Sequence, residues 1–281
     1  MRIYVSTLAF RGDSLETIIQ KAKENGISLE FSSGVPYRPD LIDLFLDAPV
    51  SKIAHNYFPP PKEPYVLNLA SANEKIRRKS VNHCLRNLEL TKKTNGPFFA
   101  AHAGFCVDPD PKELGEKIVI KDSFDRSVNM NYFYDSLREI TDYAQEIGVP
   151  FYIENNVLAR FNLHQGENPL LCADSAEIIE VIESINCPDH FGLLLDTGHL
   201  KVSAETLNLS LEDETFNLMP YIRAVHHNDN NGKRDTNDKL SKDYWFLPHM
   251  SNFVTIPHVV EVKDLTVNEA LGQVQLLAYD S

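Results

Sequence analysis

Side chains able to bind a metal ion stand near the ends of several short apolar segments. They are His55, His102, Glu154, Asp196, His226 and Glu261. Mixed imidazole and carboxylate donors suit Zn²⁺, Mn²⁺ or Co²⁺ better than Ca²⁺, which prefers ligands that are all oxygen. The sequence therefore predicts a site for one divalent metal ion, with a second ion as an open alternative.

Two of these ligands are glutamates in otherwise apolar sequence. Glu154 ends the segment Phe-Tyr-Ile-Glu, and Glu261 lies in His-Val-Val-Glu-Val. Burying an unpaired carboxylate is costly, so we expect each of them to have a cationic partner. Two glutamates that face one metal ion can also move protons when their pKa values are suitably tuned. Glu154 and Glu261 are therefore the expected proton-transfer pair.

The segments that carry these residues alternate between short strands and amphipathic helices. Strands are expected at residues 1–8, 27–31, 51–57, 98–102, 150–155, 191–196, 222–227 and 258–262. This alternation is typical of parallel βα units, and eight such units form a closed barrel. An open doubly wound sheet is the alternative, but no G-x-G-x-x-G motif follows the first strand. The sequence predicts an α/β protein with a single (β/α)₈ TIM-type barrel domain over residues 1–281.

Capping patterns and apolar spacing indicate where helices begin and end. Asp13 with Glu16, and Asp174 with Glu177, have the spacing of a capping box ahead of an apolar helix face. The polar segment 108–125 is expected to be a long loop. In a parallel barrel the C-terminal strand ends meet at one rim, where TIM-barrel sites lie. The barrel would therefore bring the candidate ligands together.

Length, charge and cysteine content limit the class of protein. The chain has 281 residues, of which 43% are hydrophobic, and a formal net charge of −13. Because duplex DNA is bound through Lys and Arg, this charge argues against a nucleic-acid partner. No apolar run reaches the roughly 18 residues needed to cross a bilayer. The four cysteines form no C-x-x-C pair, so they are expected to be reduced thiols in a cytoplasmic protein.

Several short stretches occur in a fixed order along the chain. They are His55-Asn56-Tyr57, Tyr65-Val66-Leu67-Asn68-Leu69-Ala70-Ser71, Ile153-Glu154-Asn155, Leu195-Asp196-Thr197-Gly198-His199, His226-His227-Asn228-Asp229 and Pro257-His258-Val259-Val260-Glu261. In this order and spacing they resemble the xylose isomerase-like barrel superfamily, which groups sugar isomerases and epimerases with endonuclease IV. The resemblance covers nearly the whole chain and is clearest from the third strand onward.

The resemblance implies a role for each candidate ligand. The four-ligand metal site of the superfamily matches Glu154, Asp196, His226 and Glu261. His55 and His102 look like the ligands of a second metal ion in the endonucleases, with Glu154 bridging the two ions. His199 matches a third-metal ligand of the endonucleases that contacts substrate oxygens in the sugar enzymes.

One stretch departs from the endonuclease pattern. The endonucleases supply an Asp-x-His pair for their third metal ion, whereas this chain has Asp235-Thr236-Asn237. Asn is a poor ligand for such ions, so a complete three-metal site is not expected. The leading hypothesis is therefore a metal-dependent isomerase or epimerase of carbohydrate metabolism that acts on a sugar or sugar derivative, phosphorylated or not.

In that hypothesis the metal ion holds two adjacent substrate oxygens and stabilises an enediolate. The expected substrate contacts are His199, Asp229, Arg234, Asp235, Lys263 and Trp245. Lys233, Arg234 and Lys263 could equally be solvated charges, and Trp245 could equally be a packing residue. Packing or solvent positions are expected for His83, His164, His190, His249 and His258.

Two alternatives stay open. One is a phosphodiester hydrolase like endonuclease IV, which the pair His55 and His102 favours. The other is a barrel that binds metal or ligand without catalysis, for example as a subunit of an assembly. No membrane or nucleic-acid partner is expected, and a homo-oligomer is left open.

Overall fold

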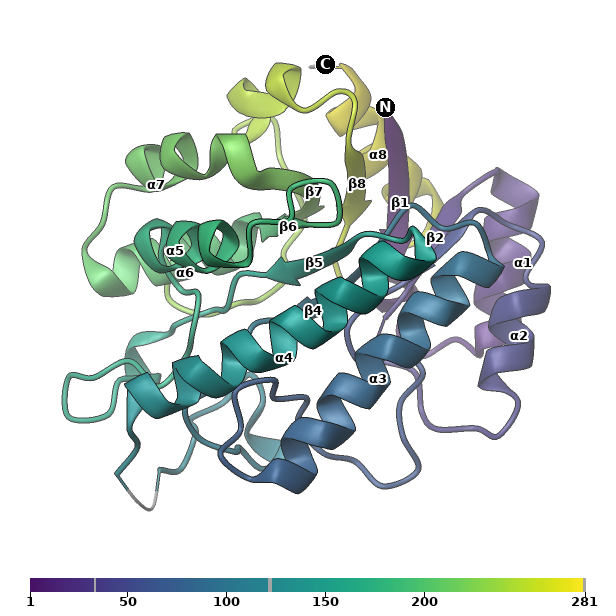
Figure 1. Ribbon diagram of the computed structural model, residues 1–281. Helices are drawn as coiled ribbons and strands as arrows, with labels where there is room; N and C mark the ends of the chain where they lie inside the picture. Colours follow the sequence, from purple (N-terminus) through teal and green to yellow (C-terminus); the bar gives the residue numbers. More distant parts are fainter. Residues whose placement is uncertain (33, 121–122, 280–281) are drawn as a thin grey trace.

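The computed structural model describes residues 1–32, 34–120 and 123–279 and contains a barrel of eight parallel strands (Figure 1). The strands are β1 (Arg2–Ser6), β2 (Ser28–Phe31), β3 (Lys52–Ala54), β4 (Phe99–His102), β5 (Phe151–Glu154), β6 (Phe191–Asp196), β7 (Ile222–His227) and β8 (Pro257–Val260). Their order in the sheet is β3-β2-β1-β8-β7-β6-β5-β4. A parallel bridge between His55 and Ala100 joins β3 to β4 and closes the ring. The predicted α/β TIM-type barrel is thus confirmed.

Helices surround the strands and fill the connections between them (Figure 1). They are α1 (Leu15–Asn25), α2 (Leu41–Asp47), α3 (Glu74–Lys93), α4 (Arg126–Ile147), α5 (Ser175–Ile185), α6 (Thr197–Leu207), α7 (Leu211–Leu218) and α8 (Val267–Tyr279). None of the helices in the described part of the chain is long and apolar enough to span a membrane. The four cysteines are free thiols, as predicted.

Local sequence explains the ends of these helices, with two corrections. The N-cap of α1 is Ser14, whose side chain accepts from the backbone N–H of Thr17, so the predicted box at Asp13 is wrong. Asp174 caps α5 as predicted and accepts from the N–H of Glu177. The Glu177 carboxylate, however, accepts from the N–H of Cys172 and pairs with Arg126, so the second box is not complete.

Two apolar layers hold the barrel together, because successive strand residues point to opposite faces. The barrel interior is packed by Tyr4, Ile53, Phe98, Ala100, Leu194, Ala224 and Val259. The outward-facing strand residues, such as Val5, Leu29 and Phe151, pack against the helices in a larger layer. Packing on both faces holds the strands in place, so side chains at the C-terminal ends of the strands have fixed positions.

A third apolar group, here called the rim cluster, lies in the loops beyond the strands. Its buried members are Val66, Phe105, Ile118, Leu158, Leu170 and Ala173. Part of it comes from the predicted loop 108–125, which holds only a short 3₁₀ turn at Pro111–Glu113 in its described residues. Residues 121 and 122 of that loop lie outside the described residues. The rim cluster therefore packs over the end of the barrel where the candidate ligands are expected.

Candidate metal centre

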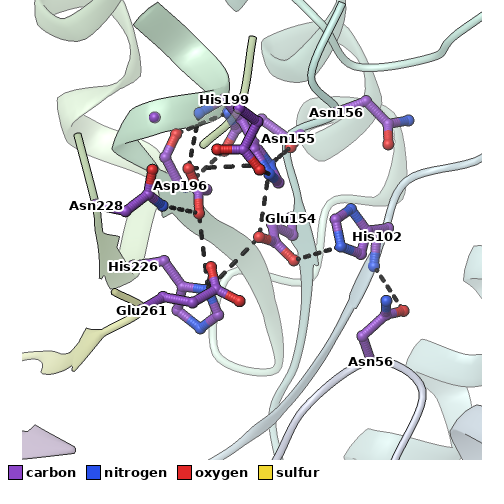
Figure 2. Close-up of polar contacts among 12 residues, drawn as sticks. Asn56, His102, Glu154, Asn155, Asn156, Asp196, His199, His226, Asn228 and Glu261 are labelled. Carbon is purple, nitrogen blue, oxygen red and sulfur yellow. Dashed lines mark hydrogen bonds and ion pairs between the residues drawn. The ribbon is translucent and has the colours of Figure 1, made fainter. Parts of the chain in front are cut away.

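His226, the fifth residue of β7, lies beside Glu261, Glu154 and Asp196 (Figure 2), and its two ring nitrogens are directed at different carboxylates. Its Nδ1 lies 3.1 Å from Glu261, 3.5 Å from Glu154 and 3.9 Å from Asp196. These four residues come from β5, β6, β7 and the position just after β8, and their ligand atoms lie within 4.8 Å of one another. The four residues matched to the superfamily's metal site are thus brought together.

Glu30 occupies the other side of the His226 ring. This residue lies in β2, is fully buried, and places Oε1 2.7 Å from His226 Nε2. A carboxylate on one ring nitrogen fixes that nitrogen as the donor and leaves the other free to bind a metal ion. Sequence reasoning missed Glu30, although a single Glu in the apolar run Leu29-Glu30-Phe31 shows the same anomaly that identified Glu154.

Glu154 connects two groups of possible ligands. Its Oε1 lies 3.5 Å from His226 Nδ1 and 3.6 Å from His199 Nδ1. Its Oε2 lies 3.0 Å from Nε2 of His55 and 3.3 Å from Nε2 of His102. One carboxylate therefore faces the four-residue cluster and a second cluster made by His55 and His102. This arrangement matches the bridging role implied by the resemblance.

Asp196 is held in place by three neighbouring groups. As the N-cap of α6 it accepts from the backbone N–H of His199 at 2.7 Å, and it accepts from Asn228 Nδ2 at 2.8 Å. Asn155 donates to the Asp196 carbonyl and accepts from its N–H, which ties the end of β5 to the end of β6. The carboxylate is therefore positioned before any ligand binds. Asn155 and Asn228 lie in stretches that carry the family resemblance, but their supporting role was not predicted.

The carboxylates differ in how the surroundings affect their pKa values. Burial would raise the pKa of Glu154, but the imidazoles of His102 and His55 hold it well below its usual value. Burial would also raise the pKa of Glu261, but the neighbouring His226 lowers it to about 2. The pKa of Asp196 is raised well above its usual value by burial and by repulsion from Glu261 and Glu154. Such crowding of carboxylates is typical of functional sites.

The histidines also separate into two groups. Removal from water, together with the nearby imidazoles of His199 and His55, lowers the pKa of His102 to about 4. Burial would lower the pKa of His226 too, but Glu30 and Glu261 raise it well above its usual value. The pKa of His199 is raised against burial by Asp196 and Asp235. The histidines of the site therefore differ in the direction in which their surroundings shift their pKa values.

A series of buried hydrogen bonds connects His227, the residue after His226, to neighbouring segments. His227 Nε2 lies 2.8 Å from His258 Nδ1, and His258 Nε2 donates to the Phe253 carbonyl at 2.9 Å. Tyr244 contacts His227 Nδ1 at 3.1 Å and Thr197 Oγ1 at 2.6 Å. His258 is therefore a packing residue, as expected, but one that supports the strand end carrying His226.

The donor set and its unmet contacts fit a bound metal ion. Both Glu154 oxygens are buried, and neither forms a hydrogen bond of acceptable geometry, although imidazole nitrogens lie close to them. Buried polar atoms without a partner are rare in folded proteins and often mark a missing ion or water. One imidazole and three carboxylates that converge on one point are suited to Zn²⁺, Mn²⁺ or Co²⁺.

A cavity of about 480 Å³ opens over the clusters, lined by residues that include His102, His199, Asp235 and Glu261. His199 Nε2 lies 3.4 Å from Asp235, so this expected substrate-contact pair meets in the cavity. Arg234 also lines it, but its guanidinium pairs with Glu116 at 3.3 Å. The cavity size falls within the roughly 300–1,000 Å³ of small-molecule sites.

The other three expected substrate contacts, Asp229, Lys263 and Trp245, lie outside the lining of this cavity. The carboxylate of Asp229 pairs with Lys201 at 2.6 Å, and the backbone N–H of Lys263 donates to the Asn237 carbonyl. Trp245 packs edge-on against Phe246, with ring centroids 5.3 Å apart. None of the three is among the described residues that line the cavity.

Comparison with known families gives a match over most of the chain. The family model described as "Xylose isomerase-like TIM barrel" matches residues 7–254. Among curated proteins, the "Probable endonuclease 4" of Aquifex aeolicus is 27% identical over 216 residues, which cover 70% of this chain and 68% of that protein. The uncharacterized protein MJ1614 of Methanocaldococcus jannaschii is 27% identical over 60% of this chain and 54% of its own length. The chain thus spans between about half and two thirds of these two relatives.

Solved structures share the fold over the whole chain. The crystal structure of a D-tagatose 3-epimerase-like protein has a TM-score of 0.75 at 19% identity and covers 100% of this chain and 97% of its own. The D-psicose 3-epimerase of Clostridium cellulolyticum H10, crystallised with D-tagatose, has a TM-score of 0.69 at 14% identity, covering 99% of both chains. The IOLI protein, solved with a zinc atom, has a TM-score of 0.64 at 14% identity and covers 100% of this chain and 97% of its own. At these identities the likeness establishes the fold.

Proposed function

The chain belongs to the xylose isomerase-like TIM barrel family, and on that basis we propose that it is a metal-dependent isomerase or epimerase of a sugar or sugar derivative. The observation that carries the proposal is the meeting of Glu154, Asp196, His226 and Glu261 around one point, beside a cavity that Glu261 lines. Sugar epimerases among the solved structures with this fold support the same substrate class.

The metal ion would be held by the four-residue cluster, in which His226 offers Nδ1 because Nε2 is engaged by Glu30. When bound, such an ion supplies Lewis-acid chemistry, drawing charge onto substrate oxygens and making an adjacent C–H more acidic. His55 and His102 could hold a second ion with Glu154. The residues fit Zn²⁺, Mn²⁺ or Co²⁺.

Glu154 and Glu261 are the residues proposed to move the proton. β5 and β8 are separated by β6 and β7 in the sheet, so the two carboxylates approach the shared point from different directions. One carboxylate would take a proton from carbon while the other returns one, as epimerisation at a carbon centre requires. Both are held on or directly after strands, which keeps them in fixed positions.

His199 and Asp235 would orient the substrate. The Nδ1–H of His199 donates to the Asn155 carbonyl at 2.9 Å, which leaves Nε2 directed toward Asp235 and the cavity. A neutral or protonated imidazole beside a carboxylate can bind hydroxyl groups as donor and acceptor together. These two residues would therefore hold sugar oxygens above the metal ion.

A metal-dependent phosphodiester hydrolase is the second candidate. It is favoured by the cluster of His55, His102 and Glu154 and by the similarity to the Aquifex protein. Against it, Asn237 lines the cavity where the endonuclease pattern has a histidine, and Arg234 is the one Lys or Arg among the described lining residues. A phosphate backbone is normally bound by several such cations.

Metal analysis combined with a sugar panel tests the proposal. Protein purified without chelator should hold at least one transition-type metal ion per chain and convert one member of a panel of aldoses and ketoses. Asp196→Ala and His226→Ala should each lower metal occupancy sharply, because each removes a ligand from the four-residue cluster. Elemental analysis measures the occupancy, and chromatography measures the conversion.

An aspartate and a histidine away from the cluster provide matched controls for Asp196→Ala and His226→Ala. Asp189 and His190 lie between α5 and β6, at the opposite end of β6 from Asp196, so Asp189→Ala and His190→Ala should leave occupancy unchanged. A protein that contains no metal and also fails to bind added Zn²⁺, Mn²⁺ or Co²⁺ would contradict the metal centre. Metal binding without conversion of any sugar would contradict the reaction but not the site.

A further inference from the structure

The cavity above the metal cluster has two chemically different ends. Its floor carries polar groups that include His102, His199, Asp235 and Glu261. Its outer wall is largely apolar and includes Leu8, Val66, Leu67, Phe105, Leu114, Ile118, Val157, Phe161 and Leu170. A ligand that fills both ends must therefore combine a polar part with an apolar part.

The apolar wall is built from the rim cluster. Val66, Phe105, Ile118 and Leu170 belong to this cluster and line the cavity, and they are between 3% and 7% exposed. They follow β3, β4 and β5, so separate connections converge on one surface. Leu114 lines the same cavity yet remains 52% exposed, which leaves a large aliphatic side chain available to a ligand.

Charges at the outer end do not favour an anionic group. Arg234 pairs with Glu116 and lies 5.0 Å from the centre of the Phe161 ring, so its charge is already engaged. Glu113 and Glu116 also line this end and would repel a phosphate or carboxylate. Within the described lining, no second Lys or Arg offsets them.

We propose that the substrate is a sugar derivative that carries an uncharged, apolar alkyl or aryl group on its anomeric oxygen, with the reacting carbons elsewhere on the sugar. The sugar end rests on the proposed function, and the substituent would lie against the rim cluster. The hydroxyl groups of an unsubstituted sugar would gain no partners from aliphatic side chains such as Val66 and Ile118, and losing water there is costly. Burying an apolar group on the same side chains is favourable.

Matched glycosides test the proposal directly. The probes are methyl, n-hexyl and 5-carboxypentyl β-glycosides of glucose, galactose and mannose, titrated calorimetrically into zinc-loaded protein. Each buried methylene is worth roughly fourfold in affinity, so at least one hexyl glycoside should bind about tenfold or more tightly than its methyl counterpart. The carboxypentyl glycoside, of the same chain length, should lose most of that advantage because its carboxylate meets the acidic outer end.

Two variants on one segment locate the effect. Leu114→Asn should reduce the hexyl-to-methyl affinity ratio at least twofold, since it removes an apolar contact from the cavity mouth. Val119→Asn is the matched control, because Val119 is 58% exposed and is not among the described lining residues of this cavity. Both side chains are exposed, so neither change should prevent folding. An unchanged ratio in Leu114→Asn, or an equal reduction in Val119→Asn, would overturn the assigned wall.

The outcomes separate this inference from the proposed function. Equal binding of hexyl and methyl glycosides throughout, or equal binding of hexyl and carboxypentyl glycosides, overturns the inference even when free sugars are converted. A hexyl advantage in a protein that converts no sugar and exchanges no carbon-bound hydrogen keeps the apolar wall and overturns the isomerase or epimerase.

Discussion

Glu30 determines which nitrogen of His226 faces the metal cluster. Its buried carboxylate lies 2.7 Å from His226 Nε2, and the second carboxylate oxygen has no hydrogen-bond partner among the described residues. A carboxylate behind a metal-binding histidine orients the ring and raises the basicity of the ligating nitrogen. The role of Glu30 is therefore to position a ligand rather than to touch the substrate.

Glu30→Gln should weaken metal binding without unfolding the protein. Glutamine keeps the shape but removes the negative charge behind His226, and loss of such a partner typically costs about 10–100-fold in affinity. Zinc titration against a competing chelator measures the change, with thermal unfolding of the metal-free protein recorded in parallel.

Glu214→Gln is the matched control for this change. Glu214 is also a buried glutamate, but it accepts from the N–H and hydroxyl of Ser175 and lies on α7, away from the metal cluster. It should alter stability without altering zinc affinity. Equal zinc affinity in Glu30→Gln and the unmodified protein would show that His226 does not depend on Glu30.

At the scale of elements, the N-terminus of α6 and the end of β7 fit together closely. A Cβ atom on Gly198 would overlap Asn228 Oδ1 and come within 2.8 Å of Asn228 Cγ. Asn228 donates to Asp196, so this glycine allows the contact that holds a proposed metal ligand. The Asp-Thr-Gly-His stretch therefore serves packing as well as ligation.

Gly198→Ala should destabilise the fold and weaken metal binding. Overpacking of a filled interior typically costs about 1–3 kcal/mol, and displacing Asn228 would release Asp196. Gly272→Ala in α8 is the control, because a Cβ there meets no atom within 4 Å and Ala favours a helix by roughly 0.5–1 kcal/mol. Chemical denaturation and zinc titration report the two effects, and Gly198→Ala behaving like Gly272→Ala would refute the tight fit.

The strands were largely predictable because the spacing of apolar residues along the sequence indicates where they lie. Apolar runs located all eight strands, and their C-terminal ends identified Glu154, Asp196 and His226 as neighbours. Exact boundaries were less predictable: Glu261 follows β8 rather than lying within it, and Ser14 replaces Asp13 as a cap. Both depend on local hydrogen bonds that a periodic pattern does not encode.

Contacts between distant segments were the part that sequence could not supply. Arg234 looked like a free cation, yet its partner Glu116 lies in another loop. Trp245 was left open between covering a sugar and packing, and its contact with Phe246 is visible only in the structure. The rim cluster likewise joins side chains from separate connections, and no repeating pattern links them. Such contacts become visible only in three dimensions.

At the scale of the whole molecule, net charge bears on the choice between the two candidate functions. The chain carries 40 Asp and Glu against 27 Lys and Arg, a formal net charge of −13. Some relatives of the chain are named as endonucleases, whereas structural neighbours with the same fold are named as epimerases. Because a fold hosts many reactions, the chemistry of the cavity must decide between them.

We predict no tight binding to duplex DNA that contains abasic sites, and no incision of it. The acidic balance disfavours phosphate contacts, and Asn237 replaces the histidine of the endonuclease pattern. An incision assay at low salt with added Zn²⁺ or Mn²⁺ measures this. Metal-dependent nicking that disappears in Glu154→Gln would make the hydrolase the leading function.

Transfer of a carbon-bound proton is the central claim, and hydrogen exchange with solvent tests it most directly. The measurement follows deuterium incorporation from D₂O into a converted sugar by nuclear magnetic resonance, with metal content determined on the same samples. The unmodified protein should place deuterium on the reacting carbon. Glu154→Gln and Glu261→Gln, where they retain metal, should lose turnover by roughly 10²–10⁴, the usual contribution of a general acid or base. Turnover without any deuterium incorporation, or full activity in either metal-loaded variant, would contradict the account.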